Sequence, residues 1–231
     1  MKGFVVSDLH IFSSRSYAQD TIKSMHKQVR NADFLVLNGD IFDFAWTVLD
    51  SMEQTISEAV NWLSNLSFQY PDCRIYYILG NHDNFEPFVQ LILSMTDKLR
   101  NLCICNTHLV LGKHLFIHGD LPLAHKNPWV RNLQRKISKN NSLFHLCYEY
   151  AVKYRLHNIV YSYFSPEYCS DRICKALEKY HKDFLENIEH IYFGHTHLPF
   201  DGYFHKKFTF YNTGSAVHGV TINVIEIQYD S

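Results

Sequence analysis

The chain has 231 residues, of which 22 are Lys or Arg and 23 are Asp or Glu, so its formal net charge is -1 at pH 7. A hydrophobic fraction of 46% at this length is typical of a globular α/β domain with a substantial core, and it excludes a disordered chain. The near-zero charge excludes a general electrostatic attraction to nucleic acid or anionic lipid. Histidine is abundant, at 15 residues, which is typical of metal sites or pH sensing but also occurs through composition alone.

The lengths of the apolar runs and the spacing of the cysteines indicate the cellular compartment. The first eight residues lack the apolar stretch and cleavage site of a secretory signal. The longest apolar runs have about six residues, whereas about 20 are needed to span a bilayer. No C-x-x-C pair occurs among the six cysteines, so we expect buried thiols and no zinc ribbon. These features predict a cytoplasmic protein without a transmembrane segment.

The first hundred residues alternate between apolar runs and amphipathic segments. Strands and helices are expected in alternation at 2–6, 16–31, 34–37, 47–66, 74–79 and 85–97. Such alternation predicts an α/β sheet, which binds ligands at the carboxyl ends of its strands.

From about residue 102 the pattern changes to short strands. Strands are expected at 102–104, 107–111 and 114–117, with Gly112-Lys113 as a hairpin turn. Residues 121–188 show helical spacing of apolar and aromatic positions, and strand character returns at 190–193, 209–211 and 221–227. We therefore expect one domain over residues 1–231 with a helical insertion at 121–188.

Five short polar motifs lie at the ends of predicted strands. Four follow a strand directly and the fifth ends one. They are Asp8-Leu9-His10, Gly39-Asp40-Ile41-Phe42-Asp43, Gly80-Asn81-His82-Asp83, His118-Gly119-Asp120 and Gly194-His195-Thr196-His197. Each supplies oxygen or imidazole donors, none supplies sulfur, and the glycines let the backbone turn sharply beside the donors. We expect the five motifs to converge on one edge of the sheet.

The motifs together supply seven potential metal donors, which are Asp8, His10, Asp40, Asn81, His118, His195 and His197. One ion takes about four to six ligands, so seven donors favour two ions, especially if one carboxylate bridges them. Two ions about 3.5–4 Å apart form a clamp for in-line displacement at phosphorus, in which a metal-bound hydroxide attacks. The alternative is a set of unrelated polar loops, and five motifs in this order at strand ends argue against it.

The motif series D-x-H, G-D-x-x-D, G-N-H-D, H and G-H-x-H resembles that of the calcineurin-like metallophosphoesterases. The resemblance implies a four-layer αββα sandwich with a two-metal site. It implies one ion held by Asp8, His10, Asp40 and His197. It implies a second ion held by Asp40, Asn81, His118 and His195, with Asp40 bridging the two.

The same resemblance implies that His82 is not a ligand. It would face the phosphate and either stabilise the transition state or protonate the leaving oxygen, with Asp43 or Asp83 orienting it. The two divalent ions are expected to be Mn, with Fe or Zn as alternatives, because the donors are oxygen and imidazole. No other cofactor is expected. Asn212, Gly214 and Ser215 resemble the family's loop that helps to close the site.

In length and layout the chain is most similar to the UDP-2,3-diacylglucosamine pyrophosphatases of lipid A synthesis. These also carry a G-D-I/L-F-D motif and a helical insertion between H-G-D and G-H-T-H, which caps the site as a lid and grips acyl chains. The resemblance implies that 121–188 is a lid, that the substrate is a nucleotide-linked lipid, and that the protein contacts the inner face of a membrane peripherally. One departure is His82, where those enzymes have arginine.

The insertion is rich in aromatic and basic residues, including Trp129, Tyr148, Tyr150, Tyr154, Tyr161, Tyr163, Phe164, Arg131, Arg135, Lys136 and Arg155. They would bind a lipid-like or nucleotide-containing diphosphate. The alternative is that the aromatic residues form the core of a helical subdomain and the charges are solvated.

The predicted function is a dinuclear-metal phosphoesterase that hydrolyses a phosphodiester or diphosphate. The alternatives are a nucleotide phosphodiesterase or general phosphatase of the same family and, more distantly, an inactive metal-binding scaffold. A protein phosphatase would have Arg-Gly after Asp43, where this chain has Phe44-Ala45. A phosphate-ester substrate is the expected partner, nucleic acid is not, and the sequence carries no signal for an oligomeric state.

Overall fold

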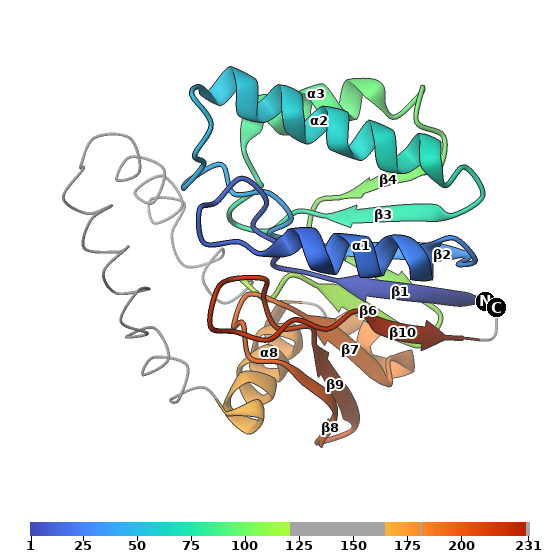
Figure 1. Cartoon of the computed structure of the whole chain (residues 1–231). Helices are drawn as coiled ribbons and strands as arrows, with labels where there is room; N and C mark the ends of the chain where they lie inside the picture. The colour runs from blue at the N-terminus through green and yellow to red at the C-terminus, as the bar shows by residue number, and fades with distance from the viewer. Residues whose placement is uncertain (121–164, 181, 230–231) are drawn as a thin grey trace.

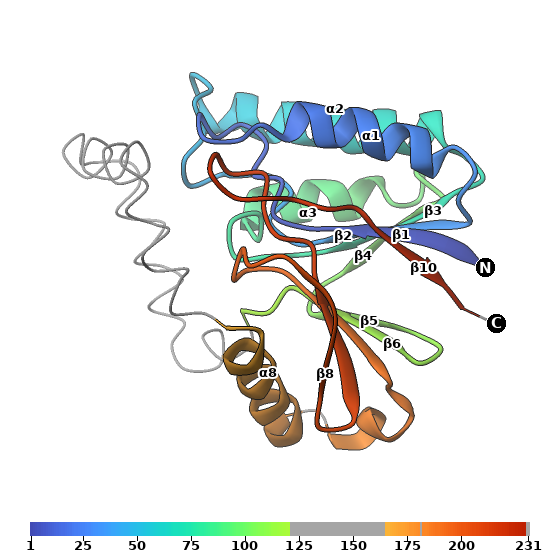
Figure 2. The same cartoon turned by 60° about the horizontal axis from the view of Figure 1, so that its bottom comes forward.

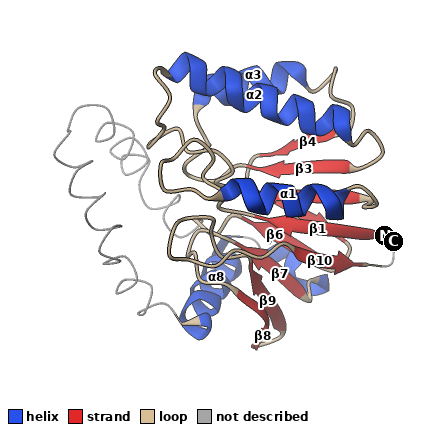
Figure 3. Ribbon diagram, viewed as in Figure 1, coloured by secondary structure: helices blue, strands red, loops and turns tan. Residues whose placement is uncertain are grey.

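The computed structural model describes residues 1–120, 165–180 and 182–229. These residues form two five-stranded sheets packed face to face, with helices on both outer faces (Figure 1, Figure 2). Figure 3 shows the same layers as blue helices outside and red strands inside. The four-layer αββα sandwich predicted from the sequence is therefore confirmed.

The first sheet has the strand order β10-β1-β2-β3-β4. Its members in chain order are β1 (Lys2–Val6), β2 (Phe34–Asn38), β3 (Arg74–Ile78), β4 (Leu102–Cys105) and β10 (Ile225–Gln228). Strands β1 to β4 are parallel, and β10 pairs antiparallel with β1. Every residue of β2 is buried, as expected for a parallel strand covered on both faces.

Three helices cover the outer face of this sheet, α1 (Ala18–Val29), α2 (Met52–Gln69) and α3 (Glu86–Met95) (Figure 2). Helix α2 begins later than the apolar spacing predicts. The hydroxyl of Ser51 accepts a hydrogen bond from the Gln54 N–H at 3.0 Å, which makes Ser51 the N-cap.

The second sheet has the strand order β5-β6-β7-β9-β8. Its members are β5 (His108–Leu111), β6 (His114–Ile117), β7 (His190–Phe193), β8 (Phe200–His205) and β9 (Phe208–Asn212). Strands β6, β7 and β9 are parallel, and β5 and β8 are antiparallel edge strands. The predicted hairpin at Gly112-Lys113 joins β5 to β6.

The fourth layer comes from inside the predicted insertion of 121–188. Helix α8 (Pro166–Tyr180) and the short 3-10 helix η1 (Lys182–Asn187) lie on the outer face of the second sheet (Figure 2). The buried cluster between them and the sheet contains Cys169, Ile173, Cys174, Leu177, Leu185, Ile188, Leu115, Ile117, Ile191, Phe193, Phe208 and Phe210. The rest of the insertion, 121–164, lies outside the described residues, together with its aromatic and basic side chains.

The carboxyl ends of the parallel strands of the two sheets lie next to each other. The side chain of Asn38, the last residue of β2, donates to the carbonyl oxygens of Ile117 on β6 at 3.0 Å and of Tyr192 on β7 at 3.3 Å. These bonds join strand ends of different sheets, so the loops that follow β1, β2, β3, β6 and β7 come together.

The described residues contain no helix that is long and apolar enough to cross a membrane. Their five cysteines are free thiols, of which Cys73, Cys169 and Cys174 are buried in the core. The expectation of buried thiols is confirmed for these three, while Cys103 and Cys105 on the edge strand β4 are partly exposed.

Candidate metal centre

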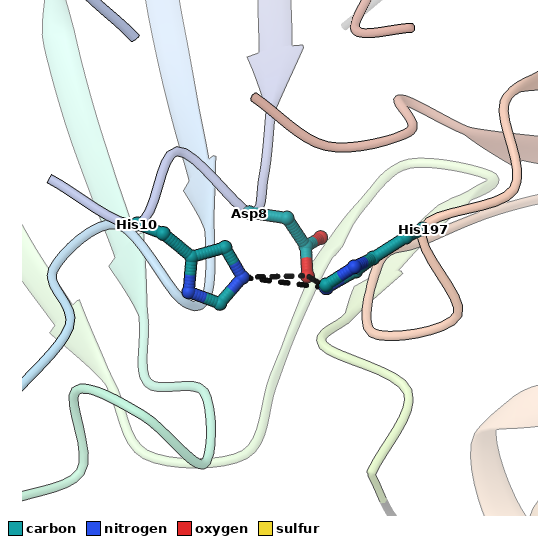
Figure 4. A group of neighbouring side chains, drawn as sticks. All are labelled: Asp8, His10 and His197. Atoms are coloured by element: carbon teal, nitrogen blue, oxygen red, sulfur yellow. Dashed lines mark hydrogen bonds and ion pairs between the residues drawn. The ribbon is translucent and has the colours of Figure 1, made fainter. Parts of the chain in front are cut away.

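Asp8, His10 and His197 form one group of donors (Figure 4). The first two follow β1 and the third follows β7. The Nε2 atom of His197 lies 3.2 Å from Oδ1 of Asp8 and 3.3 Å from Nε2 of His10. Two imidazole nitrogens and a carboxylate oxygen thus converge, which is a donor set that fits a divalent transition metal.

Neighbouring polar groups fix the orientation of the Asp8 carboxylate. Its Oδ2 accepts a hydrogen bond from the Ser7 hydroxyl, and that hydroxyl lies 2.7 Å from Oγ1 of Thr213. The backbone N–H of His195 is 3.1 Å from both carboxylate oxygens. A Cβ at Gly194 would collide with the side chains of Asp8 and Ser7, so only glycine allows this approach.

Asp40, His118 and His195 form a second group of donors, from the loops after β2, β6 and β7. Nε2 of His118 lies 3.1 Å from Oδ2 of Asp40 and 3.3 Å from Oδ1 of Asn81. The other ring nitrogen, Nδ1, is 3.2 Å from the Asn38 carbonyl oxygen, to which it donates. This bond fixes the tautomer and leaves Nε2 for a metal, as second-sphere partners of metal-bound histidines do.

Asp40 lies between the two groups. Its carboxylate also clusters with ring nitrogens of His10 and His82, so it is near donors of both sets. Its Oδ1 accepts the backbone N–H of His82 at 2.8 Å. A Cβ at Gly80 would collide with the Asp40 carboxylate and backbone, which explains the glycine before Asn81.

The backbone of the donor loops is left-handed at most donor positions. Seven non-glycine residues of the described chain have φ between 48° and 79°, and five of them are predicted ligands, namely Asp8, His10, Asp40, His195 and His197. An L-residue in this conformation costs about 1–2 kcal/mol. Such strain gathers at functional sites because the surrounding structure holds it there.

Burial and mutual charge set the protonation of this cluster. Burial alone would raise the pKa values of Asp8 and Asp40, but the imidazoles of His197 and His118 outweigh it and hold both below their usual value. Burial and the charge of His118 lower the pKa of His195 to about 4. These two carboxylates and the His195 imidazole are thus in the protonation states that metal ligation requires. Burial would also lower the pKa of His118, but the charge of Asp40 outweighs it and raises this pKa well above its usual value, so a metal ion bound there would displace a proton.

His82 sits beside the donors and is held by Asp43. Its Nδ1 is 3.0 Å from Oδ1 of Asp43, and the same oxygen accepts the Trp46 N–H at 2.9 Å. Burial would lower the pKa of His82, but the charges of Asp43 and Asp40 outweigh it and raise the pKa to about 9. Bound divalent cations would oppose this rise, since they repel an imidazolium.

Asp83 has a different set of partners from Asp43. One of its oxygens accepts the Ile41 N–H at 2.8 Å and the Tyr77 hydroxyl at 2.7 Å, and the other accepts the Gly80 N–H at 2.6 Å. Asp83 therefore ties the loop after β3 to the loop after β2. Of the two carboxylates predicted to orient the His82 ring, Asp43 is the one in contact with it.

Four polar residues around the donors were not predicted from the sequence, namely Ser7, Thr213, Arg15 and Trp46. Ser7 directly precedes the first motif and Thr213 lies between the predicted loop residues Asn212 and Gly214, so both positions carried a usable signal, whereas Arg15 and Trp46 lie outside every motif. Of the predicted loop residues, Ser215 donates its hydroxyl to the Asp8 carbonyl oxygen at 3.1 Å. Asn212 donates to the Gly194 carbonyl oxygen at 3.2 Å.

The sequence matches the Calcineurin-like phosphoesterase family over residues 1–199, a span that contains all five motifs. No curated protein matches the sequence. The nitrogen and oxygen donors, gathered in two groups around Asp40, are the set that a pair of divalent ions requires. The chain therefore belongs to the calcineurin-like phosphoesterase family and is a metal-dependent phosphoesterase of the dinuclear type.

Proposed function

We propose that the chain hydrolyses a phosphodiester or diphosphate with two Mn ions. The ligands in this proposal are Asp8, His10, Asp40, Asn81, His118, His195 and His197. The observation that carries it is the convergence of Asp8, His10 and His197 in one group and of His118 and His195 in another, with Asp40 between the groups and His82 beside them. Asn81 joins the second group through its contact with His118 at 3.3 Å. The donors come from five loops that are far apart in sequence, and they meet at one sheet edge, as a shared metal site requires.

The proposed division of ligands follows the two groups. Asp8, His10 and His197 would hold one ion, and Asn81, His118 and His195 would hold the other. Asp40 would be shared by both ions, which is supported by its place near His118, His195 and His10. When bound, the ions activate water as the nucleophile and neutralise charge on the phosphoryl oxygens.

The chain's own residues supply the acid. Oδ1 of Asp43 accepts a hydrogen bond from Nδ1–H of His82, so Nε2 is the ring nitrogen left to contact the substrate. The His82 side chain is 23% exposed while Asp43 is fully buried, so the imidazole is accessible and its partner is not. A protonated His82 donates a charge-assisted hydrogen bond to the phosphoryl group or a proton to the leaving oxygen.

Metal reconstitution tests this function. The protein is stripped with a chelator, refilled separately with Mn, Fe or Zn, and assayed on bis-p-nitrophenyl phosphate and p-nitrophenyl phosphate, with bound metal measured in parallel. We expect about two ions per chain, turnover of the diester above that of the monoester, and the highest rate with Mn. Full occupancy with all three metals and no turnover of either ester would favour the inactive scaffold.

A UDP-linked lipid diphosphate is the second substrate candidate. The support is the layout of the chain, in which a long insertion follows His118-Gly119-Asp120 and leads to Gly194-His195-Thr196-His197. UDP-2,3-diacylglucosamine is therefore included as a substrate, and release of UMP from it is the diagnostic product. Turnover of simple diesters but not of this lipid would leave the nucleotide phosphodiesterase as the better assignment.

A further inference from the structure

Asp43 lies at the junction of several positively charged or ionisable side chains. Its Oδ1 accepts hydrogen bonds from His82 Nδ1 and the Trp46 N–H. Its Oδ2 is 3.5 Å from Nδ1 of His10 and 3.6 Å from Nη2 of Arg15. Within the described residues this Oδ2 has no hydrogen-bond donor. A buried carboxylate oxygen in that position depends on nearby positive charge for its stability and its orientation.

Arg15 is held in place by a loop from another part of the chain. It belongs to the loop between β1 and α1, and its guanidinium carbon lies 5.9 Å from the ring centroid of Trp46, in the loop between β2 and α2. The Val48 N–H donates to the Phe12 carbonyl oxygen at 2.9 Å and joins the two loops. The Arg15 side chain is 10% exposed, and its guanidinium lies near both the indole ring and the carboxylate.

We propose that Arg15 is a positioning residue of the phosphoesterase reaction, whose guanidinium holds the Asp43 carboxylate at the angle at which it orients the His82 ring. The inference rests on the proposed function, because it requires His82 to act on the substrate. Arginine suits this task because its charge is permanent and its planar group has a fixed shape. A lysine would supply the positive charge but not the planar guanidinium group.

A direct contact between Arg15 and the substrate phosphate is the competing role. The burial of the side chain and its 3.6 Å separation from Asp43 favour positioning. The two roles affect kinetics differently. Loss of a positioning residue lowers kcat and leaves KM nearly unchanged, whereas loss of a ground-state phosphate contact raises KM.

The test compares Arg15→Met, Arg15→Lys and Arg15→Ala with the matched control Arg74→Met. Arg74 also packs its guanidinium on an aromatic ring, 5.9 Å from the Tyr76 centroid, but it lies at the amino end of β3, away from the site. With saturating metal we expect Arg15→Met to lower kcat about 10- to 100-fold, the usual effect of losing a second-sphere partner. Arg15→Lys should lower kcat less than Arg15→Met does, because lysine keeps the positive charge. Guanidinium ion at millimolar concentration should raise the kcat of Arg15→Ala.

A second readout does not depend on turnover. In the metal-free protein, the proton resonance of His82 Nδ1–H, assigned by its absence in His82→Ala, should shift in Arg15→Met and stay in place in Arg74→Met. The proposal would be overturned if the wild type is active and Arg15→Met shows both an unshifted His82 resonance and an unchanged kcat. A raised KM and weaker inhibition by inorganic phosphate at constant kcat would also overturn it, in favour of a substrate contact. Inactivity of the wild type on every ester would instead count against the proposed function, and the resonance would still decide the role of Arg15.

Discussion

His82 and Asp43 form a hydrogen-bonded pair in which only one partner reaches solvent. Nδ1 of His82 is 3.0 Å from Oδ1 of Asp43, and the carboxylate is fully buried while the imidazole side chain is 23% exposed. The buried charge fixes one ring nitrogen and raises the pKa of His82 to about 9. The pair therefore has the geometry of a proton donor presented at the edge of the metal centre.

The first prediction concerns this pair. His82→Ala should keep both metal ions and lower kcat about 10²- to 10⁴-fold, since it removes an acid and no ligand. Asp43→Asn should lower kcat less, about 10- to 100-fold, because the His82 ring is still present and only the charge that orients it is lost. Steady-state kinetics at saturating metal, with metal content measured on the same samples, checks both values.

A double-mutant cycle is the control for this prediction. If Asp43 acts through His82, the double variant should be no slower than His82→Ala, because residues that act as a unit are not additive. Additive losses would show that Asp43 acts separately, for example through its contact with His10 at 3.5 Å.

The second prediction concerns the bridging carboxylate. Asp40→Ala should abolish activity and metal binding together, because Asp40 lies near donors of both groups. The matched control is Asp72→Ala in the exposed turn before β3, which should bind metal and turn over like the wild type. Calorimetric titration with Mn and the diesterase assay are the measurements. Retained turnover in Asp40→Ala would exclude the bridging role.

Most strands, and the set of candidate donors, could be predicted from the sequence because both follow from local patterns, whereas β8 (Phe200–His205) was not predicted. Apolar runs ending in Gly-Asp, Gly-Asn-His-Asp or Gly-His-Thr-His identify buried parallel strands, and the rule that ligands bind at their carboxyl ends brings the donors together. The start of α2 was missed because one hydroxyl, that of Ser51, decides it. The spacing of apolar residues predicted helical structure where α8 lies, but this spacing does not indicate which sheet the helix covers.

Residues that support the donors were harder to predict, because long-range contacts define them. Thr213 reaches the Ser7 hydroxyl from 206 positions along the chain. Arg15 belongs to no motif and meets Asp43 only after two loops pack together. The left-handed backbone at His195 and His197 was not predicted either, since only a few per cent of non-glycine residues adopt it, although histidine is enriched among them.

The third prediction concerns the close approach of the loop after β7 to Asp8. Gly194→Ala should weaken metal binding at least about tenfold, because the added Cβ would displace the Asp8 carboxylate and the Ser7 hydroxyl that fixes it. The control is Gly202→Ala on β8, where a Cβ meets no atom within 4 Å but φ is +77°. It should cost stability of about 1 kcal/mol through the backbone and leave metal affinity unchanged. Equal metal affinities in the two variants would contradict the steric argument.

The fourth prediction concerns His114, at the opposite end of β6 from the metal centre. Its ring is buried, stacks on His190 with centroids 4.7 Å apart, and its Nδ1 lies 3.2 Å from the Tyr192 hydroxyl. Burial, followed by the charge of His190, lowers the pKa of His114 from 6.5 to about 4, against the smaller opposing effect of Glu189. The folded state thus keeps this ring neutral at pH values where the unfolded chain already protonates it.

The sign of the pH effect follows from this difference. Between about pH 6.5 and pH 4 the unfolded chain binds a proton at this histidine that the folded protein does not, so stability falls as the pH falls. His114→Gln should therefore flatten the decline in the free energy of unfolding between pH 7 and pH 5, measured by urea denaturation at fixed metal concentration. Tyr192→Phe, which removes the hydroxyl partner and keeps the His114 ring, should lower stability at every pH and retain the decline. A wild-type slope in His114→Gln would show that other groups carry the acid sensitivity.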